Sequence, residues 1–132
     1  MSKSIQLKDS SGNIYPVTYT VESNQYGEAF KFSSGLMICK LNYTVTRRIN
    51  NAWGNIYISS IINPPNYPVA FKNIPTYSIS VNGTDGCWIM IDGKNYNSTK
   101  EHGPSFYLVR SNQALNTDVN FNANIIAIGV WK

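Results

Sequence analysis

The sequence predicts an all-β fold, an antiparallel β-sandwich of the jelly-roll type. Short apolar runs rich in β-branched and aromatic residues recur along the chain, and Gly, Asn or Pro separates them. Several runs alternate apolar and polar residues with period two, as at Phe30 and Phe32 or at Ile89 and Ile91. No window repeats apolar residues at the 3.6-residue spacing of an amphipathic helix. Many short strands at regular spacing are typical of a sandwich.

Each strand is expected where an apolar run lies between turn-forming residues. In chain order these runs are residues 4–8, 13–21, 28–32, 36–45, 53–62, 77–81, 87–91, 105–109 and 124–131. The Asp, Ser, Gly and Asn residues at 9–13 predict a turn that joins the first two runs in a hairpin. Pro16 in the second run lacks an amide donor, which favours an edge strand. Only residues 111–121 are compatible with a helical turn.

Composition indicates one domain with a neutral, polar surface. The chain has 132 residues, the length of a single domain. Charged residues make up 14% of it, below the usual value of about 25%, whereas seventeen residues are Asn and nine are Tyr. The net charge is +4, but the basic residues are scattered, so we expect no nucleic-acid partner. Cys39 and Cys87 stand among apolar residues, and we interpret them as buried thiols, with a disulfide or metal site as the alternative.

No segment predicts a membrane span or a secretory signal. A transmembrane helix needs roughly 18 consecutive apolar residues, and no run approaches that length. The first ten residues, "MSKSIQLKDS", lack the apolar core of a signal peptide. We therefore expect synthesis in a cytoplasm and no insertion into a membrane.

No residue pattern singles out a catalytic centre, a metal site or a cofactor. The single histidine, His102, lies in the polar segment "KEHGPS". The stretch "DGKNYNS" begins like a calcium loop, but Lys94 and Tyr96 occupy positions that need oxygen ligands. A glycosidase needs two carboxylates, and nothing marks out a pair among the seven present. We expect a protein that is not an enzyme and uses no cofactor.

Three stretches occur in an order and spacing that resemble a known family. They are "FKFSSGLMICKLNYTV" at 30–45, "YPVAFKNIPTYSISV" at 67–81 and the closing "IIAIGVWK" at 125–132. Together they resemble the C-terminal head domain of bacteriophage tail-fibre and receptor-binding proteins, which closes on a WIAIG.WK-type motif. The resemblance covers roughly residues 28–132. The chain departs from the pattern at Ile125, where the family commonly has Trp.

The resemblance implies a β-sandwich head that associates as a homotrimer. It also divides the chain into an N-terminal arm or hairpin at 1–27, a possible attachment segment, and a head at 28–132. The last strand is apolar on both faces, so one face can lie in the sandwich and the other against neighbouring subunits. We expect Ile126, Ile128 and Val130 in the sandwich core. We expect the opposite face to contact neighbours through Ile125, Ala127 and Trp131.

The function implied is that of a non-enzymatic adhesin in a virion tail, assembled in the host cytoplasm, which recognises a bacterial surface glycan. Asn side chains can bond to sugar hydroxyls, and Tyr and Trp offer flat rings with a polar edge. Weak single sites gain from three linked copies. Two alternatives stay open. One is a structural tail or baseplate component that binds other virion proteins, and the other is a glycan depolymerase.

A candidate ligand site follows from the expected connections. If the strands connect mainly as hairpins, the loops at 47–52 and 93–103 fall at one end of the sandwich. These loops are rich in Asn, Tyr, His and charge. We expect the ligand-binding residues there, namely Tyr96, His102, Asn95, Asn97, Trp53 and Asn51. The alternative is that both segments are solvated loops without a ligand.

Overall fold

The chain folds as an antiparallel all-β protein. The computed structural model describes residues 2–83, 86–92 and 99–132, and no helix occurs among them. Their strands are β1 (Ser2–Lys8), β2 (Ile14–Asn24), β3 (Gly27–Phe32), β4 (Leu36–Trp53), β5 (Ile56–Ser59), β6 (Thr76–Asn82), β7 (Cys87–Asp92), β8 (Ser105–Arg110) and β9 (Leu115–Val130). The predicted fold class is confirmed, and each predicted apolar run contributes to one of these strands.

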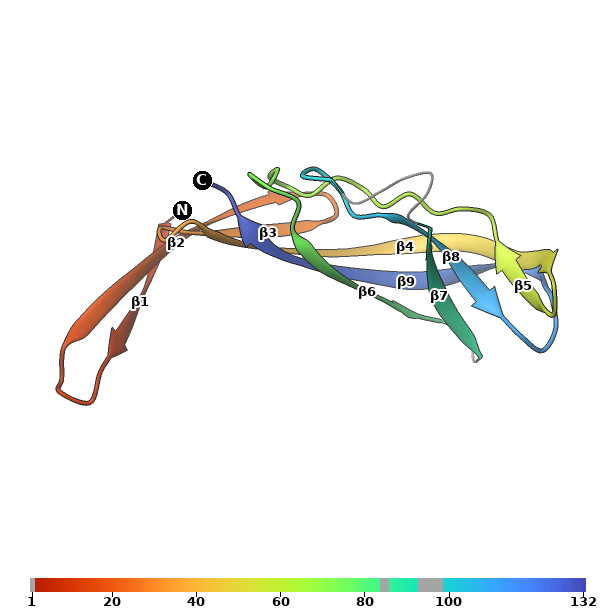
Figure 1. Cartoon of the computed structure of the whole chain (residues 1–132), viewed down its shortest axis with the longest axis horizontal. Helices are drawn as coiled ribbons and strands as arrows, with labels where there is room; N and C mark the ends of the chain where they lie inside the picture. Colours follow the sequence, from red (N-terminus) through yellow and green to blue (C-terminus); the bar gives the residue numbers. More distant parts are fainter. Residues whose placement is uncertain (1, 84–85, 93–98) are drawn as a thin grey trace.

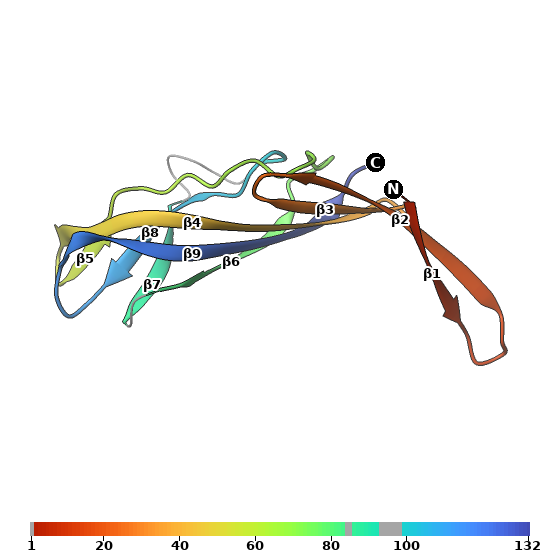
Figure 2. The same cartoon turned by 180° about the vertical axis from the view of Figure 1, so that it is seen from behind.

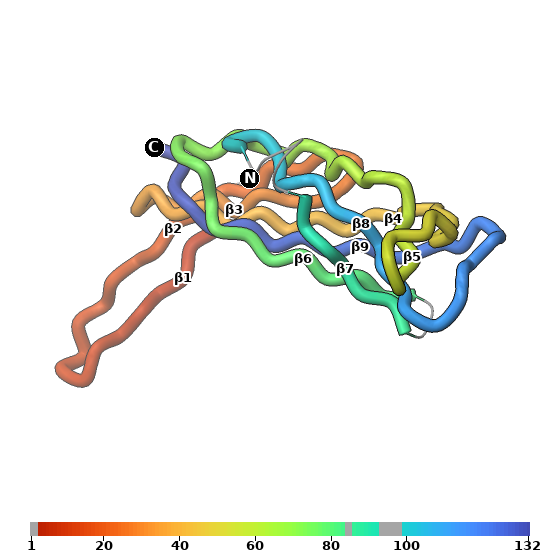
Figure 3. Tube along the Cα trace, turned by 45° about the vertical axis from the view of Figure 1, so that its right-hand side comes forward, coloured from red at the N-terminus to blue at the C-terminus, as the bar shows by residue number. Residues whose placement is uncertain are grey.

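All these strands belong to one sheet that curls into two layers. Strands β1 to β5 pair in succession, β5 continues to β8 and β7, and β9 lies between β4 and β6. One edge of β4 pairs first with β3 and then with β5, while the other edge pairs with β9 along most of its length (Figures 1 and 2). Strands β5, β8 and β7 thereby return over the ribbon of β4, β9 and β6 (Figure 3).

The two longest strands extend beyond the apolar runs that predicted them. Strand β4 includes residues 47–53, most of which we expected in a loop, and β9 begins at Leu115 rather than near residue 124. These two polar extensions pair with each other, with Arg47 opposite Val119. Residues 111–121, which the sequence left open to a helical turn, therefore contain the first part of β9 instead. The pairing was hidden because the outward side chains of both extensions are solvated and polar.

A crossover breaks the expected alternation of loops. Residues 60–75 leave β5 and reach β6, which pairs with β9 instead of β5. Since residues 47–52 are in a strand, they form no loop at all. The loop-end argument that placed the candidate ligand site is therefore wrong.

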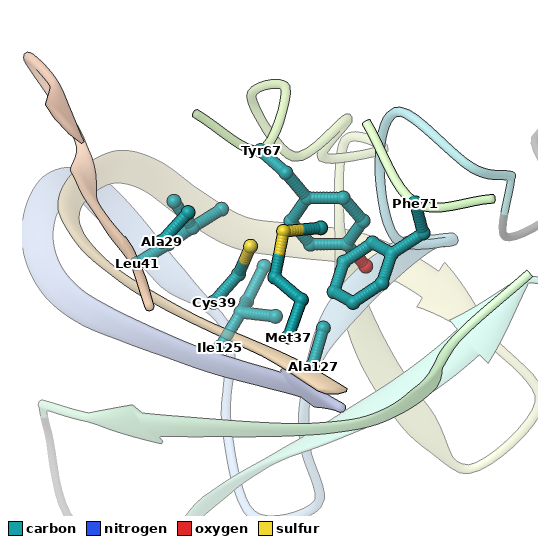
Figure 4. Packing of buried hydrophobic residues seen from close by; sticks show 8 residues of the cluster. All are labelled: Ala29, Met37, Cys39, Leu41, Tyr67, Phe71, Ile125 and Ala127. Carbon is teal, nitrogen blue, oxygen red and sulfur yellow. The ribbon is translucent and has the colours of Figure 1, made fainter. Parts of the chain in front are cut away.

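The crossover covers the first of two core clusters. Tyr67 and Phe71, both from the crossover, meet edge to face with ring centroids 5.2 Å apart. They lie over small and apolar side chains of β3, β4 and β9 (Figure 4). The buried members are Ala29, Met37, Cys39, Leu41, Tyr67, Phe71, Ile125 and Ala127. Cys39 is a fully buried thiol that forms no disulfide, and this burial raises its pKa to about 12, whereas Cys87 is half-buried.

The second core cluster joins the two layers of the curled sheet. Phe106 and Leu108 of β8 face the ribbon of β4 and β9, and all of these side chains are almost fully buried. The buried members are Val45, Ile49, Ile62, Phe106, Leu108, Phe121 and Ala123. Burying this much apolar surface in two contiguous clusters supplies the main driving force for folding.

The closing motif ties the C-terminus to the sheet. The Trp131 indole Nε1 donates to the Phe32 carbonyl at 2.8 Å, and the Trp131 amide donates to the Gly35 carbonyl at 3.0 Å. The Lys31 ammonium lies 4.5 Å from the centroid of the Trp131 ring, within range of a cation–π contact. Gly35 has a φ of 101°, which residues with a side chain rarely adopt. The last residues are therefore held and do not fray.

The structure buries the face of β9 that we expected to contact neighbouring subunits, and it exposes the face that we expected in the core. Ile125 and Ala127 are fully buried in the chain's own core. Ile126 and Ile128 are each 47% exposed, and Val130 is 37% exposed. The expectation that these three form the core is therefore wrong. Both faces of the strand are apolar, so hydrophobicity alone does not tell which of them the crossover covers.

Replacing Gly129 by Ala should destabilise the fold. A Cβ at this position would lie 2.8 Å from Cδ1 of Phe71, so the crossover would have to shift. Overpacking of this kind typically lowers the free energy of unfolding by about 1–3 kcal/mol. Chemical denaturation would measure the change. Gly103→Ala is the matched control, because its added Cβ would meet nothing closer than 3.6 Å; equal stability of the two variants would contradict the close packing of Phe71 on Gly129.

Candidate functional site

The candidate site lies on the outer face of the layer formed by β5, β8 and β7. Because side chains alternate along a strand, the burial of Phe106 and Leu108 turns Tyr107 outward. Residues directly opposite each other in antiparallel strands share a face. Met90 pairs with Tyr107 and Asp92 with Ser105, so Met90 and Asp92 lie on the same side of the layer as Tyr107, although Ser105 itself is buried.

The end of β4 adds a tryptophan to the same face. Ile58 pairs with Val109, which lies two residues from Tyr107 and therefore on its face. Trp53 pairs with Ile56, which in turn shares the face of Ile58. Trp53 is 54% exposed, an unusual position for the largest side chain.

These side chains line an open groove of about 400 Å³. This volume falls within the roughly 300–1,000 Å³ of typical small-molecule sites. The described residues that line it are Trp53, Ile58, Met90, Ile91, Asp92 and Tyr107. The groove thus combines two aromatic side chains, three aliphatic ones and one carboxylate.

A hydrogen bond joins the two polar groups of the groove. The Tyr107 hydroxyl donates to Oδ2 of Asp92 at 3.3 Å, and the Ser105 hydroxyl donates to the Asp92 backbone carbonyl at 3.1 Å. Desolvation raises the pKa of Tyr107, and the Asp92 carboxylate raises it further. Tyr107 therefore stays protonated at neutral pH, as a hydroxyl that can donate, beside an oxygen that can accept. This pair can bond to hydroxyls or amides, but it offers no activated nucleophile.

A buried serine holds the two strands beneath the groove in register. Ser59 is 1% exposed, and its hydroxyl accepts from the Leu108 amide at 3.0 Å and donates to the Ser60 carbonyl at 2.8 Å. The Ser59 hydroxyl takes the place of a backbone carbonyl as the acceptor for this amide, just beyond the last residue pair of β5 and β8. Ser59 thereby helps to fix the backbone of Leu108, which directly follows Tyr107 in β8.

The structure separates the six predicted site residues. Trp53 lines the groove, whereas Asn51 lines a different, polar hollow beside Arg48 and Asp118. The other residues that line this hollow are Thr46, Arg47, Asn50 and Ser60, and Arg48 contacts Asp118 at 3.1 Å. Tyr96, Asn95 and Asn97 lie outside the described residues.

His102 lies apart from the residues that line the groove. Its amide bonds to Oγ1 of Thr99 at 3.2 Å, and its ring Nδ1 lies 2.8 Å from the Gly103 carbonyl, a distance that suits donation by Nδ1–H. The segment around it packs on the crossover, because the Tyr67 amide donates to the Glu101 carbonyl at 2.7 Å. His102 is therefore half-buried in a structural connection.

Sequence reasoning missed Tyr107, Asp92 and Met90. A signal was available, because "SFYLV" and "CWIMID" both alternate with period two, which puts these residues on one face of adjacent strands. Within the described ranges no group of three or more His, Cys, Asp or Glu side chains could hold a metal ion. The same residues include no helix long and apolar enough to cross a membrane.

Two solved structures share this arrangement of strands. One is an N-truncated R1-type pyocin tail fiber, with 13% identity and a TM-score of 0.53 over 87% of this chain and 86% of that chain. The fold of this chain is therefore similar to that of the pyocin tail fiber. The other is a P. aeruginosa R1 pyocin fiber comprising C-terminal residues 323–701, with 14% identity and a TM-score of 0.51 over 87% of this chain and 28% of that one. No protein-family model and no curated protein matches the sequence.

Replacing Ser59 by Ala should destabilise the layer that carries the groove. The change leaves the buried Leu108 amide without its acceptor, which typically costs about 1–3 kcal/mol of the free energy of unfolding. Thermal or chemical unfolding would show it. Ser60→Ala, at an exposed neighbour that keeps its backbone carbonyl, should change stability by less than about 0.5 kcal/mol. If both variants unfold together with the unchanged protein, Ser59 has no such role.

Proposed function

We propose that this chain is a receptor-binding component of a bacteriophage or prophage-derived virion tail, and that it binds a glycan on the bacterial host surface without cleaving it. The pyocin tail-fibre fold supports the tail assignment. The observation that carries the glycan assignment is the groove itself, where an exposed tryptophan and a tyrosine stand beside a carboxylate.

The chemistry of the groove fits a sugar. A pyranose ring has apolar faces that can stack on Trp53 and hydroxyls on its edge that can bond to Asp92 and Tyr107. The open shape of the groove suits one part of a longer polysaccharide. The described lining of the groove holds one carboxylate, Asp92, whereas glycosidases use a pair, which favours binding over hydrolysis.

We further propose that the protein acts as a homotrimer. The outer face of β4 and β9 carries an apolar patch, defined here as Leu36, Ile38, Ile126, Ile128 and Val130. Ile38 is half-buried, and the other four side chains are 37–47% exposed. The register places Leu36 opposite Val130 and Ile38 opposite Ile128, so the patch is contiguous. An exposed contiguous apolar patch usually marks a contact surface.

A structural role in the tail is the second candidate function. The hairpin of β1 and β2 projects from the body and has exposed apolar side chains (Figure 1). Such a hairpin could bind another tail protein. This role is compatible with the groove having no ligand, so the groove variants below separate the two candidates.

Replacing Trp53 by Ala should weaken binding to the host glycan. Loss of one stacked ring should reduce the affinity of a single site about tenfold, equivalent to about 1.4 kcal/mol. A glycan array followed by titration with host-wall polysaccharide would measure it. Trp53→Ala should leave the melting temperature nearly unchanged, because the side chain is half-exposed.

Three further variants make this experiment specific. Trp88→Ala removes a tryptophan of similar exposure that does not line the groove, so it should keep its affinity. Tyr96→Ala and His102→Ala test the loop that the sequence favoured. If those two weaken binding while Trp53→Ala does not, the groove is not the site. Release of reducing sugars from the polysaccharide would show a depolymerase instead.

Light scattering should give the mass of three chains rather than the 14.8 kDa of one. Ile128→Asp should lower that mass towards a single chain, because it places a charge in the middle of the apolar patch. Asn122→Asp, on an exposed position further along the same strand, is the control that should leave the mass unchanged. A mass of one chain for the unchanged protein at micromolar concentration would contradict the trimer.

A further inference from the structure

The arm is a two-stranded hairpin that stands away from the rest of the sheet. We define it as β1, the turn at 9–13 and residues 14–18 of β2. Within it β2 pairs only with β1, since its pairing with β3 begins at Tyr19 (Figures 1 and 2). The described side chains of β1 are all exposed, with Ile5 at 47% and Leu7 at 54%. A hairpin of two strands is at best marginally stable alone in water.

The hydrogen bonds of the turn at 9–13 give the arm a defined structure. Oδ1 of Asp9 accepts the amides of Ser11 and Asn13, both at 2.9 Å. Its other oxygen accepts from the Asn13 side chain at 3.0 Å and from the Tyr15 hydroxyl at 3.2 Å. The side-chain bond from Asn13 is the largest of several hydrogen bonds that lower the pKa of Asp9. The arm therefore has a definite turn and a fixed register.

The two faces of the arm differ in chemistry. The register puts Leu7 opposite Tyr15, Ile5 opposite Val17 and Lys3 opposite Tyr19 on one side, which we call the arm face. The other side is mostly polar, with Ile14 as its one large aliphatic residue. Its members are Ser4, Gln6, Lys8, Ile14, Pro16 and Thr18. A hairpin with one apolar face is stabilised when another protein surface packs on that face.

The arm face continues into the apolar patch of the body. Tyr19 lies beside Phe32 and Phe30, with ring centroids 5.4 Å and 6.3 Å apart. Phe30 pairs with Ile38, and Ile38 pairs with Ile128. Cross-strand partners share a face, so one side of the sheet is apolar from the tip of the arm to the C-terminal strand.

The chain cannot cover this surface by itself. Strand β2 is continuous and pairs with both β1 and β3, so the arm is an extension of the same sheet. A sheet face cannot pack on itself without bending back, and the arm projects from the end of the body (Figure 2). The partner that covers the arm face must therefore come from another molecule.

We propose that the arm face is a clasp that packs on a second copy of this chain. The arm face and the patch are both uncovered, both aliphatic and aromatic, and on the same side, so one symmetric contact between copies covers both. The arm face is also long enough to cover the patch, because the seven residues of β1 span about 23 Å and residues 126–130 of the patch span about 17 Å, at roughly 3.3 Å per residue. The inference rests on the proposed self-association and adds the element that secures it.

The test compares the two faces of the same hairpin. In a Cys87→Ser background, Leu7→Cys and Gln6→Cys place single thiols on the arm face and on the polar face. Cys39 is fully buried and should stay unreactive in the folded protein. In the assembled protein a water-soluble maleimide should label Leu7→Cys at least tenfold more slowly than Gln6→Cys. Dilution below the dissociation midpoint should abolish the difference.

A second pair of variants gives an independent readout. Leu7→Asp should raise the concentration at which half of the protein is assembled by at least tenfold, measured by light scattering. Gln6→Asp adds the same charge to the opposite face and should leave that midpoint unchanged. Circular dichroism would show that both variants keep the strand content of the unchanged protein.

The outcomes separate this inference from the proposed function. A protein that is a single chain at every concentration overturns both the trimer and the clasp. An assembly in which the two thiols react equally, and in which Leu7→Asp has no effect, overturns the clasp alone. In that case the arm face is available to a different tail protein. Neither result depends on whether the groove binds a glycan.

Discussion

The pairing of β4 with β9 is the constraint on which the rest of the structure depends. It runs from Leu36 opposite Val130 to Ile49 opposite Leu115 and brings the last strand into the middle of the sheet. Among the described residues, β9 is the only ladder partner of strand β6, and the two core clusters both take side chains from β4 and β9. Because the pairing joins segments far apart in the sequence, it can form only when most of the chain is already present.

The paired strands β4 and β9 also separate the molecule into two surfaces with different proposed roles. Their inner face is buried by the crossover and by β8, through residues such as Phe71 and Phe106. Their outer face remains open and changes from apolar near Val130 to Asn- and Thr-rich farther along. In that polar part the Thr46 hydroxyl donates to the Asn120 side chain at 2.6 Å. The proposed contacts between copies and the proposed ligand groove are therefore on separate surfaces of one sheet.

Small residues decide which face of β9 the crossover can cover. Ala127 and Gly129 leave room for Phe71 on the inner side, whereas the outer side carries Ile126 and Ile128. The three stretches that carry the family resemblance meet at this point. Phe71 belongs to the second, the β9 residues belong to the third, and Trp131 bonds to Phe32 in the first. The residues of these three stretches are thus explained by packing within the fold, and they say little about the ligand.

The sequence by itself determined the fold class, the positions of most strands and the turn at 9–13. These features depend on local properties, namely period-two alternation and turn-forming residues, which are visible in a few neighbouring residues. It also named Trp53 among the six expected ligand-binding residues, although the loop argument behind that choice was wrong.

Only the tertiary structure decided the features that depend on distant partners. The polar halves of β4 and β9 read as loops because each becomes a strand by pairing with the other. Ile126 and Ile125 are equally apolar, so only the position of the crossover shows that the first is exposed and the second buried. The groove likewise needs Trp53, Asp92 and Tyr107 from three strands, and no local pattern brings them together.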